Sequence, residues 1–495
     1  MYDALIVGSG FGGAATALRL AEAGMRVLIV ERGDPPRRDE VDWDQRQILI
    51  EQCYRSDSPL SVRQYGASRH SALQSNAVLG GNSVFYGGAA LRLREADLNG
   101  WPISYNDLEP YYCKAEELLG VHGAPGGICE PPRSRPYAFE PVELAPPARR
   151  ILEAGRKLGL EPFRIPLAIN FRDETRPLCI RCTTCDGFPC KIEAKNDVNG
   201  TLLRAAQQRG AEIMTGVIAD RFVEAAGCIS TLECVDGASG KRLQLRAHRF
   251  ILAAGAIGSS AVLLRSGFDR FSSLLGRGLM RHCNAVVTGF FPFQTNRAGE
   301  FHKQICFDDF YEEERSLSGR ATGLIQDIYT PAAEIVRHFA PFGLRHIASV
   351  TTKYMQNLLC IAEDEARAEN RIQLSPHETD RYGLPTTTVD HTYAPEDLRR
   401  RDFLVGKARR ILKAAGALAT RLYQIDTFSH AIGAAPFGSE PDTSVLDADC
   451  RFRNVENLWV ADGSFMPTSA GVNPSLTITA NALRVADRIA DRIDP

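Results

Sequence analysis

A glycine-rich segment near the start of the chain limits the fold more than any other feature. An apolar stretch typical of a buried strand runs directly into Gly8-Ser9-Gly10-Phe11-Gly12-Gly13, an alanine-rich helical pattern follows, and a second apolar stretch ends at Glu31. In such a pattern Gly8 permits the tight turn, Gly10 lets the backbone approach a pyrophosphate, and Gly13 lets the helix pack closely on the strand. The segment therefore predicts a βαβ dinucleotide-binding unit with the phosphates at a helix N-terminus.

The acid at the end of the second strand narrows the choice of dinucleotide. A carboxylate at Glu31 is placed to accept a hydrogen bond from a ribose hydroxyl, which favours a free 2′-hydroxyl and argues against NADP. NAD and FAD both remain open at this point.

Size and composition exclude several other classes of protein. A chain of 495 residues is too long to fold around a single hydrophobic core. Its 44% hydrophobic residues, 24% charged residues and formal net charge of -2 are typical of a globular protein. No basic cluster with interleaved aromatic residues suggests nucleic-acid binding, and no apolar run is long enough to span a membrane. Nine of the thirteen cysteines are scattered singly, as in reduced proteins, and no secretory signal pattern precedes the first strand. We expect a cytoplasmic protein.

The nucleotide-binding region is built from separated segments. A second glycine-dense stretch covers residues 79–88, another strand, glycine turn and helix pattern covers 249–260, and a strand ending in an acid at 455–462 precedes a helical pattern. Residues 284–417 differ, because strand-like pieces follow one another there with few glycine turns. We therefore expect an α/β fold with a discontinuous Rossmann-like domain around a parallel sheet, and a separate α+β domain with an antiparallel sheet.

Two polar residues near the C-terminus are candidate catalytic groups. His430 lies among small residues, and a neutral imidazole is suited to take a hydroxyl proton near pH 7 while carbon-bound hydrogen leaves as hydride. Asn473-Pro474 predicts a helix start, with Asn473 as the cap and Pro474 in the first turn. A helix N-terminus directed at a flavin would stabilise the negative charge formed on reduction. From position alone, a structural histidine and a plain helix cap are the simpler interpretations.

Taken together, these motifs resemble those of the glucose-methanol-choline (GMC) oxidoreductases. The resemblance rests on the glycine fingerprint with Glu31, the loop Gly80-Gly81-Asn82-Ser83 followed by Arg92, and residues 253–257, 276–282, 457–467 and 473–474. It implies FAD as cofactor and a six-stranded antiparallel sheet in the substrate domain. In that family a His and a downstream His or Asn form the catalytic pair, which here implies His430 and Asn473.

The resemblance also implies the cofactor-binding residues and the domain boundaries. The expected FAD-binding residues are Gly8, Gly10, Phe11, Gly12, Gly13, Glu31, Arg32, Gly80, Gly81, Asn82, Ser83, Val217, Ala254, Gly255, Asp462, Gly463, Asn473 and Pro474. The FAD-binding domain is expected in residues 1–160, 199–283 and 426–495, with a Cys-rich connecting segment at 161–198 and a substrate-binding domain at 284–425. Some family members attach the flavin to a histidine in the second glycine loop. Residues 80–88 contain none, so we expect non-covalent FAD.

Four cysteines are clustered at Cys179, Cys182, Cys185 and Cys190. Spacings of two residues let successive thiolates face one metal, so zinc or an iron–sulfur cluster is chemically reasonable. The spacing departs from the ferredoxin pattern, because four residues precede the last cysteine and no proline follows it. A Cys-rich loop with free thiols or a local disulfide is the alternative interpretation.

The expected activity is FAD-dependent oxidation of a primary or secondary alcohol to an aldehyde or ketone, with a sugar, an amino sugar or a natural-product intermediate as candidate substrates. The electron acceptor is either oxygen or an unknown carrier, so an oxidase and a dehydrogenase both fit. The acidic residues 308–314 and 363–365 favour a cationic or amino-sugar alcohol, although charged runs are more often solvated surface. The alternatives are a non-redox or structural-flavin protein, and a dehydrogenase component that passes electrons to a partner through a Cys-ligated iron–sulfur cluster.

Overall fold

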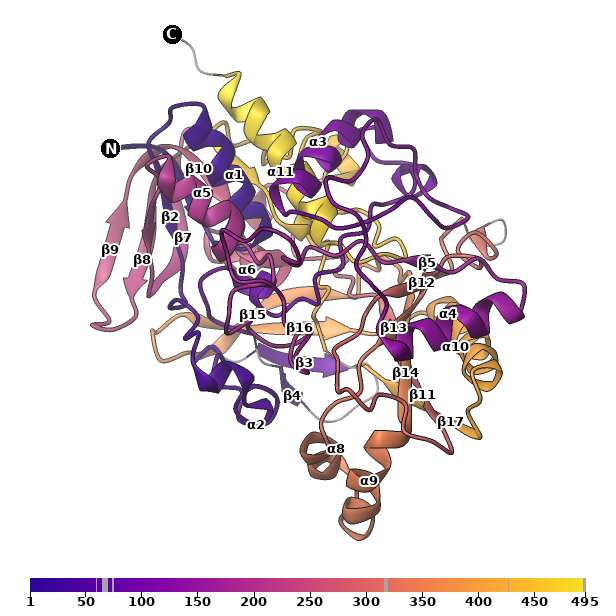
Figure 1. The fold of residues 1–495 in the computed structure, drawn as a ribbon. Coiled ribbons are helices and arrows are strands. Elements are labelled where there is room, and N and C mark those ends of the chain that lie inside the picture. Colours follow the sequence, from indigo (N-terminus) through magenta and orange to yellow (C-terminus); the bar gives the residue numbers. More distant parts are fainter. Residues whose placement is uncertain (59, 65–69, 74, 316–318, 426, 493–495) are drawn as a thin grey trace.

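A computed structural model describes residues 1–58, 60–64, 70–73, 75–315, 319–425 and 427–492 (Figure 1). Its center is a five-stranded sheet in the order β18-β10-β1-β2-β6. The strands are β1 (Tyr2–Val7), β2 (Val27–Val30), β6 (Glu212–Met214), β10 (Ala247–Leu252) and β18 (Leu458–Val460). All four neighbouring pairs are parallel. The expected discontinuous nucleotide-binding fold with a parallel central sheet is therefore confirmed.

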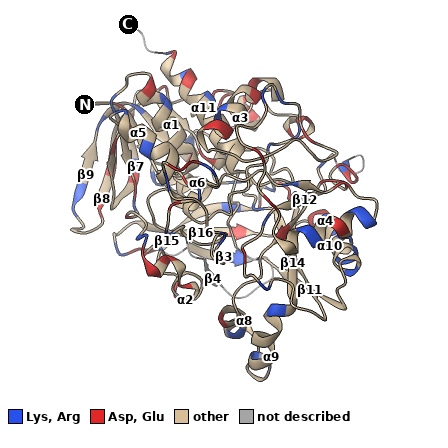
Figure 2. Ribbon diagram, in the orientation of Figure 1, with Lys and Arg blue, Asp and Glu red and all other residues tan. Residues whose placement is uncertain are grey.

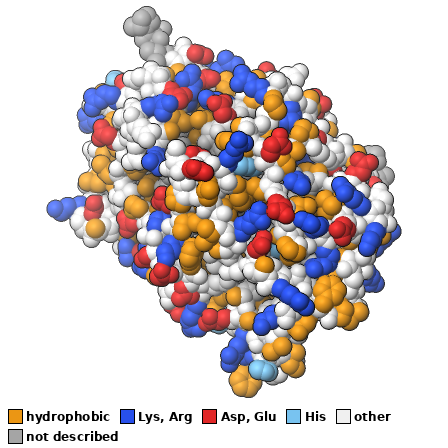
Figure 3. Space-filling model, viewed as in Figure 1, with side chains coloured by type: hydrophobic (Ala, Val, Ile, Leu, Met, Phe, Trp, Pro, Cys, Tyr) orange, Lys and Arg blue, Asp and Glu red, His pale blue; other side chains and the backbone are white. Residues whose placement is uncertain are grey.

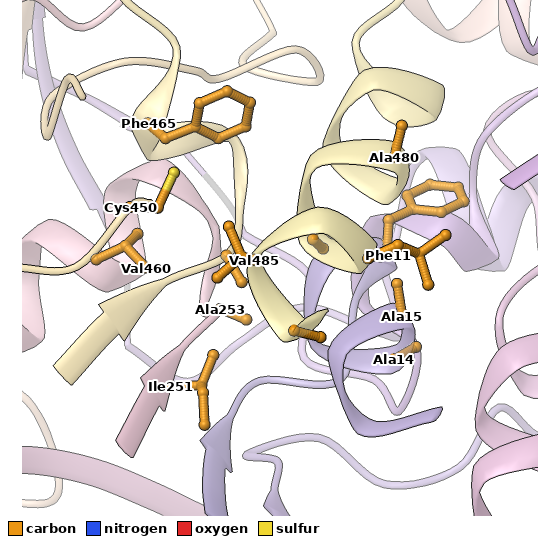
Figure 4. Packing of buried hydrophobic residues seen from close by; sticks show 14 of the residues in the cluster. Phe11, Ala14, Ala15, Ile251, Ala253, Cys450, Val460, Phe465, Ala480 and Val485 are labelled. Carbon is orange, nitrogen blue, oxygen red and sulfur yellow. The ribbon is translucent and has the colours of Figure 1, made fainter. Parts of the chain in front are cut away.

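Helices α1 (Phe11–Glu22) and α11 (Ser475–Ala490), from the two ends of the chain, pack together beside this sheet. Helix α3 (Tyr105–Leu118) packs on α11, and α6 (Gly255–Arg265) follows β10. Because parallel strands are buried on both faces, β1 and β2 are almost uniformly apolar. Figure 4 shows how small side chains of α1 and α11 let these helices pack together beside the strands, with Phe11, Ala14 and Ala480 among the buried residues.

An antiparallel sheet forms the second large unit. Its order is β17-β11-β14-β13-β12-β5, and every neighbouring pair is antiparallel. The strands are β5 (Phe163–Arg164), β11 (Cys283–Phe290), β12 (Ile305–Phe307), β13 (Gly323–Ile328), β14 (Met355–Ala362) and β17 (Ala419–Gln424). Helices α4 (Pro146–Lys157) and α10 (Pro395–Ala414) cover one face through a shared apolar cluster (Figure 1). Leu324 on the opposite face joins the core of the nucleotide-binding unit.

Two smaller sheets and several short helices complete the fold. One sheet contains β7 (Val217–Ala225), β8 (Cys228–Asp236) and β9 (Arg242–Leu245), and the other contains β3 (Leu60–Gln64), β4 (His70–Leu73), β15 (Arg371–Thr379) and β16 (Pro385–His391). The remaining helices are α2 (Gln45–Leu49), α5 (Arg204–Gln208), α8 (Ala333–Phe339) and α9 (Arg345–Thr351). The sheet of β3, β4, β15 and β16 joins segments distant in sequence through the parallel pair β16–β3.

Charged residues of both signs are interspersed over the fold (Figure 2), and on the face shown in Figure 3 they alternate with small apolar areas. Within the described ranges, no helix combines the length and the apolar character needed to cross a membrane. All thirteen cysteines are free thiols.

Candidate active site

The two glycine loops predicted from the sequence lie next to each other. A Cβ added to Gly81 would lie 3.5 Å from the Gly10 Cα atom. Ser9 connects the loops, because its hydroxyl donates to Glu31 Oε2 (2.6 Å) and accepts a hydrogen bond from the Gly80 amide (2.8 Å). Sequence reasoning did not assign Ser9 a role, although it lies inside the fingerprint. Its contacts bring the turn, the acid and the second glycine loop to one place.

The fingerprint glycines differ in what surrounds them. A Cβ on Gly12 would lie 1.8 Å from the Ala461 carbonyl oxygen, and one on Gly13 would lie 2.0 Å from the Gly8 carbonyl oxygen. Both positions therefore allow close packing of α1 on the strands. Apart from its chain neighbours, a Cβ on Gly10 would meet no atom of the described residues within 4 Å, so this backbone is open at the N-terminus of α1. That open backbone fits the pyrophosphate of a dinucleotide.

The buried Glu31 carboxylate also fits a nucleotide site. Besides the Ser9 hydroxyl it accepts the amides of Ser9 (3.1 Å) and Gly33 (3.0 Å), which hold it in one orientation. The Val217 amide donates to the Glu31 carbonyl oxygen (3.0 Å), so the residue expected near the adenine lies beside the acid. Arg32 donates to Ser75 Oγ and to the Asn76 carbonyl, which directs its guanidinium toward those residues.

Other expected cofactor residues surround the same loops. Asn82 has an exposed side chain, whereas the buried Ser83 donates its hydroxyl proton to the Gly80 carbonyl (2.7 Å). Phe11 packs edge-to-face against Tyr86, with ring centroids 5.0 Å apart. Gly463 lies at a close crossing, where an added Cβ would come within 2.9 Å of Ile432. These residues are brought together, and their contacts with FAD remain predictions.

The Asp462 carboxylate accepts hydrogen bonds from groups of the protein. It accepts the Gly255 amide (2.9 Å) and the Ser464 amide (2.8 Å), together with the hydroxyls of Ser259 and Ser464. It thereby connects the start of α6, next to Ala254, with the turn after β18. Burial raises the pKa of Asp462 above its ordinary value.

The structure brings the two predicted catalytic residues together. Asn473 Nδ2 lies 3.5 Å from His430 Nε2, although the residues belong to different loops. Gln326 of β13 donates from Nε2 to Asn473 Oδ1 (2.8 Å), which directs the amide nitrogen of Asn473 toward the imidazole. Helix α11 begins at Ser475, and Pro474 rather than Asn473 precedes it as the cap. The expected capping role of Asn473 is therefore wrong, because its side chain is held by β13 instead.

A second histidine contacts His430 from the opposite side. The Met280 and Ile432 backbones exchange hydrogen bonds of 2.9 and 3.0 Å as an antiparallel bridge. Two residues further along, the same register places His282 opposite His430, and their Nδ1 atoms lie 3.0 Å apart. The fully buried His282 also contacts the Ser469 carbonyl oxygen through Nε2 (3.0 Å). No role was assigned to His282 from sequence, although it lies in the 276–282 motif.

Burial determines the charge state of these histidines. It lowers the pKa of His430 well below its ordinary value, with His282 and Lys303 acting in the same direction and Asp364 opposing them. Burial likewise lowers the pKa of His282. Both imidazoles are therefore neutral near pH 7, so His430 has a nitrogen lone pair with which to accept a proton.

Two buried amide oxygens on the same face of the antiparallel sheet have no hydrogen-bond partner among the residues that the structure describes. They are Oε1 of Gln326 and Oδ1 of Asn284. The register aligns Asn284 with Ile361 and Leu324, so Asn284 shares the face of Gln326 and lies about 12 Å from it by strand geometry. A buried acceptor without a partner costs free energy, so these oxygens are suited to receive donors from a ligand.

Asp308 and Asp364, two of the acidic residues considered for a cationic substrate, are buried, whereas Glu312 and Glu313 of the same set are exposed. Asp308 is fully buried and accepts from Arg94 and from the Ile128 and Cys129 amides. Asp364 accepts the Arg281 and His282 amides (2.8 and 3.0 Å). Both carboxylates are bonded within the protein, and Asp364 supports the His282 backbone.

The Cys-rich segment lies between the second glycine loop and the antiparallel sheet. Gly187 donates to the Phe85 carbonyl, and Lys303 donates to Asp186 Oδ2 (2.7 Å). All four clustered cysteines line one small cavity of about 40 Å³. Among the residues that the structure describes, no group of three or more His, Cys, Asp or Glu side chains is arranged to hold a metal ion. The zinc or iron–sulfur expectation stays a prediction, which analysis of iron, sulfide and zinc in the purified protein tests.

Comparisons with known proteins agree with this arrangement. Residues 2–284 and 366–482 match the N-terminal and C-terminal models of the family described as GMC oxidoreductase. The chain is 32% identical to 6'''-hydroxyparomomycin C oxidase of Streptomyces lividus, covering 100% of this chain and 92% of that protein. It is 31% identical to paromamine 6'-oxidase of Streptomyces fradiae, covering 99% and 91%.

A solved structure shows the same fold at lower sequence similarity. Pyridoxine 4-oxidase from Mesorbium loti superposes with a TM-score of 0.71 at 20% identity, covering 98% of each chain. The chain therefore belongs to the GMC oxidoreductase family, and the expected FAD-dependent oxidation of alcohols is confirmed at the level of that family.

Proposed function

We propose that this protein oxidises a hydroxyl group of a polyhydroxylated or amino-substituted small molecule, with His430 as base and Asn473 as hydrogen-bond partner of the substrate oxygen. The 3.5 Å approach of His430 Nε2 and Asn473 Nδ2 carries this proposal. One acceptor and one donor converge there from separate loops. A substrate hydroxyl beside them donates to the imidazole and accepts from the amide.

The glycine loops hold the cofactor. Bound FAD supplies the hydride acceptor of the reaction. The open Gly10 backbone and the start of α1 bind the pyrophosphate, and Glu31 accepts from a ribose hydroxyl. Non-covalent attachment follows from the absence of histidine in residues 80–88 of the sequence.

His430 and Asn473 then act on the substrate. The neutral His430 takes the hydroxyl proton at Nε2 while the hydrogen on the carbinol carbon leaves with its electron pair, and the product is the aldehyde or ketone. Asn473 donates to the substrate oxygen and fixes the hydroxyl against the imidazole. Gln326 holds the Asn473 amide in the orientation that permits this donation.

The substrate class is supported by the two unpartnered oxygens. Gln326 Oε1 and Asn284 Oδ1 accept hydrogen bonds, so they select a molecule that carries hydroxyl or ammonium donors. By strand geometry the backbones of Gln326 and Asn284 lie about 12 Å apart, so the two residues can contact a ligand at separate points. Two relatives are named paromamine 6'-oxidase and 6'''-hydroxyparomomycin C oxidase, and these names describe amino-sugar substrates of this kind. A sterol or a long-chain alcohol leaves both oxygens buried and unpaired.

Anaerobic absorbance titration of the holoenzyme tests the proposal. Amino sugars, polyols, simple alcohols and a sterol are added in turn to the wild-type protein, to His430→Ala, and to His377→Ala, which alters an exposed histidine. We expect an amino sugar or a polyol to bleach the flavin in the wild type and the control but not in His430→Ala. Bleaching that survives in His430→Ala rejects this base. No bleaching by any alcohol favours the structural-flavin alternative.

The same titration identifies the electron acceptor. Oxygen admitted to the bleached enzyme restores the yellow colour quickly in an oxidase. A dehydrogenase stays bleached until an artificial carrier is added.

A further inference from the structure

His282 is held in an unusual backbone conformation next to the proposed base. Its φ is 60°, in the left-handed region that side chains other than glycine rarely adopt. The Asp364 carboxylate accepts its amide, and the Tyr393 hydroxyl donates to its carbonyl oxygen (2.8 Å). Strained backbone of this kind persists where surrounding contacts enforce it, and it often serves a site.

The contacts of His282 determine where its proton resides. Its Nε2 faces the Ser469 carbonyl oxygen at 3.0 Å, and a carbonyl oxygen only accepts hydrogen bonds. Nε2 must therefore carry the proton. In a neutral imidazole the other nitrogen is then an acceptor, so Nδ1 of His282 presents a lone pair to His430.

The acceptor role of His282 Nδ1 determines the tautomer of His430. The two Nδ1 atoms are 3.0 Å apart, and one of them must donate. Because His282 Nδ1 accepts, His430 Nδ1 carries the proton and His430 Nε2 is left with its lone pair. Asn473 presents Nδ2 to that lone pair, and the Gln326 contact orients the Asn473 amide in the same sense from the other end. The Ser469 carbonyl, two imidazoles and the amide therefore form one consistent hydrogen-bond chain.

We propose that His282 is a positioning residue that selects the tautomer of His430, keeping Nε2 free to take the substrate proton. This rests on the proposed role of His430 as base. In the other tautomer Nε2 carries a hydrogen and cannot accept one, so the reaction loses its base without any change of shape. His282 itself does not contact the reacting atoms.

The groups around the pair support a neutral chain. Burial lowers the pKa of His282, which keeps a second proton off its Nδ1. Lys303 lowers and Asp364 raises the pKa of His430, and the Asp364 carboxylate is also 3.7 Å from Nε2 of the buried His391. The Asp364 carboxylate accepts hydrogen bonds from the Arg281 and His282 amides. It therefore holds the His282 backbone in place, whereas the His282 imidazole makes the contact with His430.

Two variants of nearly equal shape test the proposal in the holoenzyme. His282→Asn retains an oxygen near the Nδ1 position that accepts from His430, and His282→Leu retains the shape without an acceptor. We expect the anaerobic flavin-reduction rate to stay within about fivefold of wild type in His282→Asn and to fall about 10- to 100-fold in His282→Leu. Melting temperatures are measured for both, because leucine tolerates the left-handed backbone less well.

Histidine nitrogen NMR reads the tautomer directly. Protein labelled with ¹⁵N-histidine is compared with a His430→Gln variant to assign the His430 signals, in the apoprotein and in the holoenzyme. We expect a protonated Nδ1 and an unprotonated Nε2 for His430 in the wild type, and a mixture of tautomers in His282→Leu.

The outcomes separate this inference from the proposed function. Equal rates in folded His282→Leu and His282→Asn overturn it, and so does a wild-type spectrum with the His430 proton on Nε2. If His282→Leu does not fold, the wild-type spectrum decides. Flavin reduction that survives in His430→Ala rejects the base, whereas the spectrum still tests whether His282 selects the tautomer.

Discussion

Replacing Gln326 by methionine is expected to impair catalysis while leaving stability nearly unchanged. Gln326 is fully buried on β13, its Nε2 donates to Asn473 Oδ1 (2.8 Å), and its Oε1 has no partner within the described part of the chain. Methionine has a similar length and volume but can neither donate nor strongly accept. The substitution therefore removes the hydrogen-bonded Nε2 and the unpartnered Oε1 of Gln326 together.

The two effects on the free energy of unfolding oppose each other. Leaving Asn473 Oδ1 buried without its donor costs about 1–3 kcal/mol, and removing the unpaired Gln326 Oε1 recovers a similar amount. We expect a net change within about 1 kcal/mol, and a melting temperature within about 2 °C of wild type. Catalysis has no such compensation, because the freed Asn473 amide no longer points its nitrogen at the substrate oxygen. Losing about 1.5–3 kcal/mol of that donation lowers the flavin-reduction rate about 10- to 100-fold.

Gln356→Met is a matched control on the neighbouring strand. Gln356 is equally buried but faces α4, where its Nε2 donates to the Pro147 carbonyl (2.7 Å) and its Oε1 accepts from Arg150 (3.0 Å). Both polar atoms are satisfied, so the substitution should cost about 2 kcal/mol or more of stability and leave the reduction rate unchanged. The flavin-reduction rate is measured by stopped-flow and the melting temperature by thermal unfolding, for both variants. A wild-type rate in Gln326→Met, or a larger loss of stability there than in Gln356→Met, refutes the reasoning.

Three further predictions follow from the same structure. The apoprotein of Gly10→Ala should melt within about 1 °C of wild type and yet bind FAD weakly, whereas Gly12→Ala should destabilise the apoprotein itself. An FAD affinity in Gly10→Ala equal to that of wild type would contradict the pyrophosphate assignment. Between pH 7 and 5 the melting temperature should fall, because burial lowers the pKa of His282, His391 and His430 and the unfolded chain therefore binds more protons at these histidines below pH 6.5. Each histidine costs up to about 1.4 kcal/mol per pH unit. The raised pKa values of Glu363, about 7, and Asp397, about 6, offset part of this loss, because those carboxyls bind protons in the folded state first. A melting temperature that rises on acidification would refute this sign. Acid precipitation should release all flavin into the supernatant, and yellow protein in the pellet would show covalent attachment.

The nucleotide-binding half could be predicted because its signals are local. The turn at Gly8, the close packing at Gly13 and the acid at Glu31 each follow from a fixed spacing within one βαβ unit. Such spacings determine which backbone atoms meet, whatever the rest of the chain does. Ser9 shows the limit, because its hydrogen bond from the Gly80 amide depends on a loop 71 residues away.

Asn473 shows how a correct local rule failed. Asparagine before proline at a helix start is a common cap, and nothing nearby in sequence opposes that interpretation. The competing partner is Gln326, which reaches Asn473 from a strand 147 residues away. One sign of Gln326 is present in the sequence: its polar amide directly follows the apolar residues Gly323 to Ile325 at the start of β13. A polar side chain on the buried face of a strand requires a partner, and that requirement points to a site.

The base illustrates why a catalytic residue can be named from sequence while its state cannot. An isolated imidazole has two nitrogens that exchange one proton, so identity alone does not say which nitrogen accepts from a substrate. Here the choice depends on antiparallel register: because Met280 pairs with Ile432, His282 must lie opposite His430, and a shift of one residue would turn its ring to the other face. The Ser469 carbonyl then sets the direction of the whole chain of hydrogen bonds. The chemical competence of His430 is therefore a property of the pairing between two distant segments, and substitutions that shift this pairing should abolish oxidation even when His430 and Asn473 are both present.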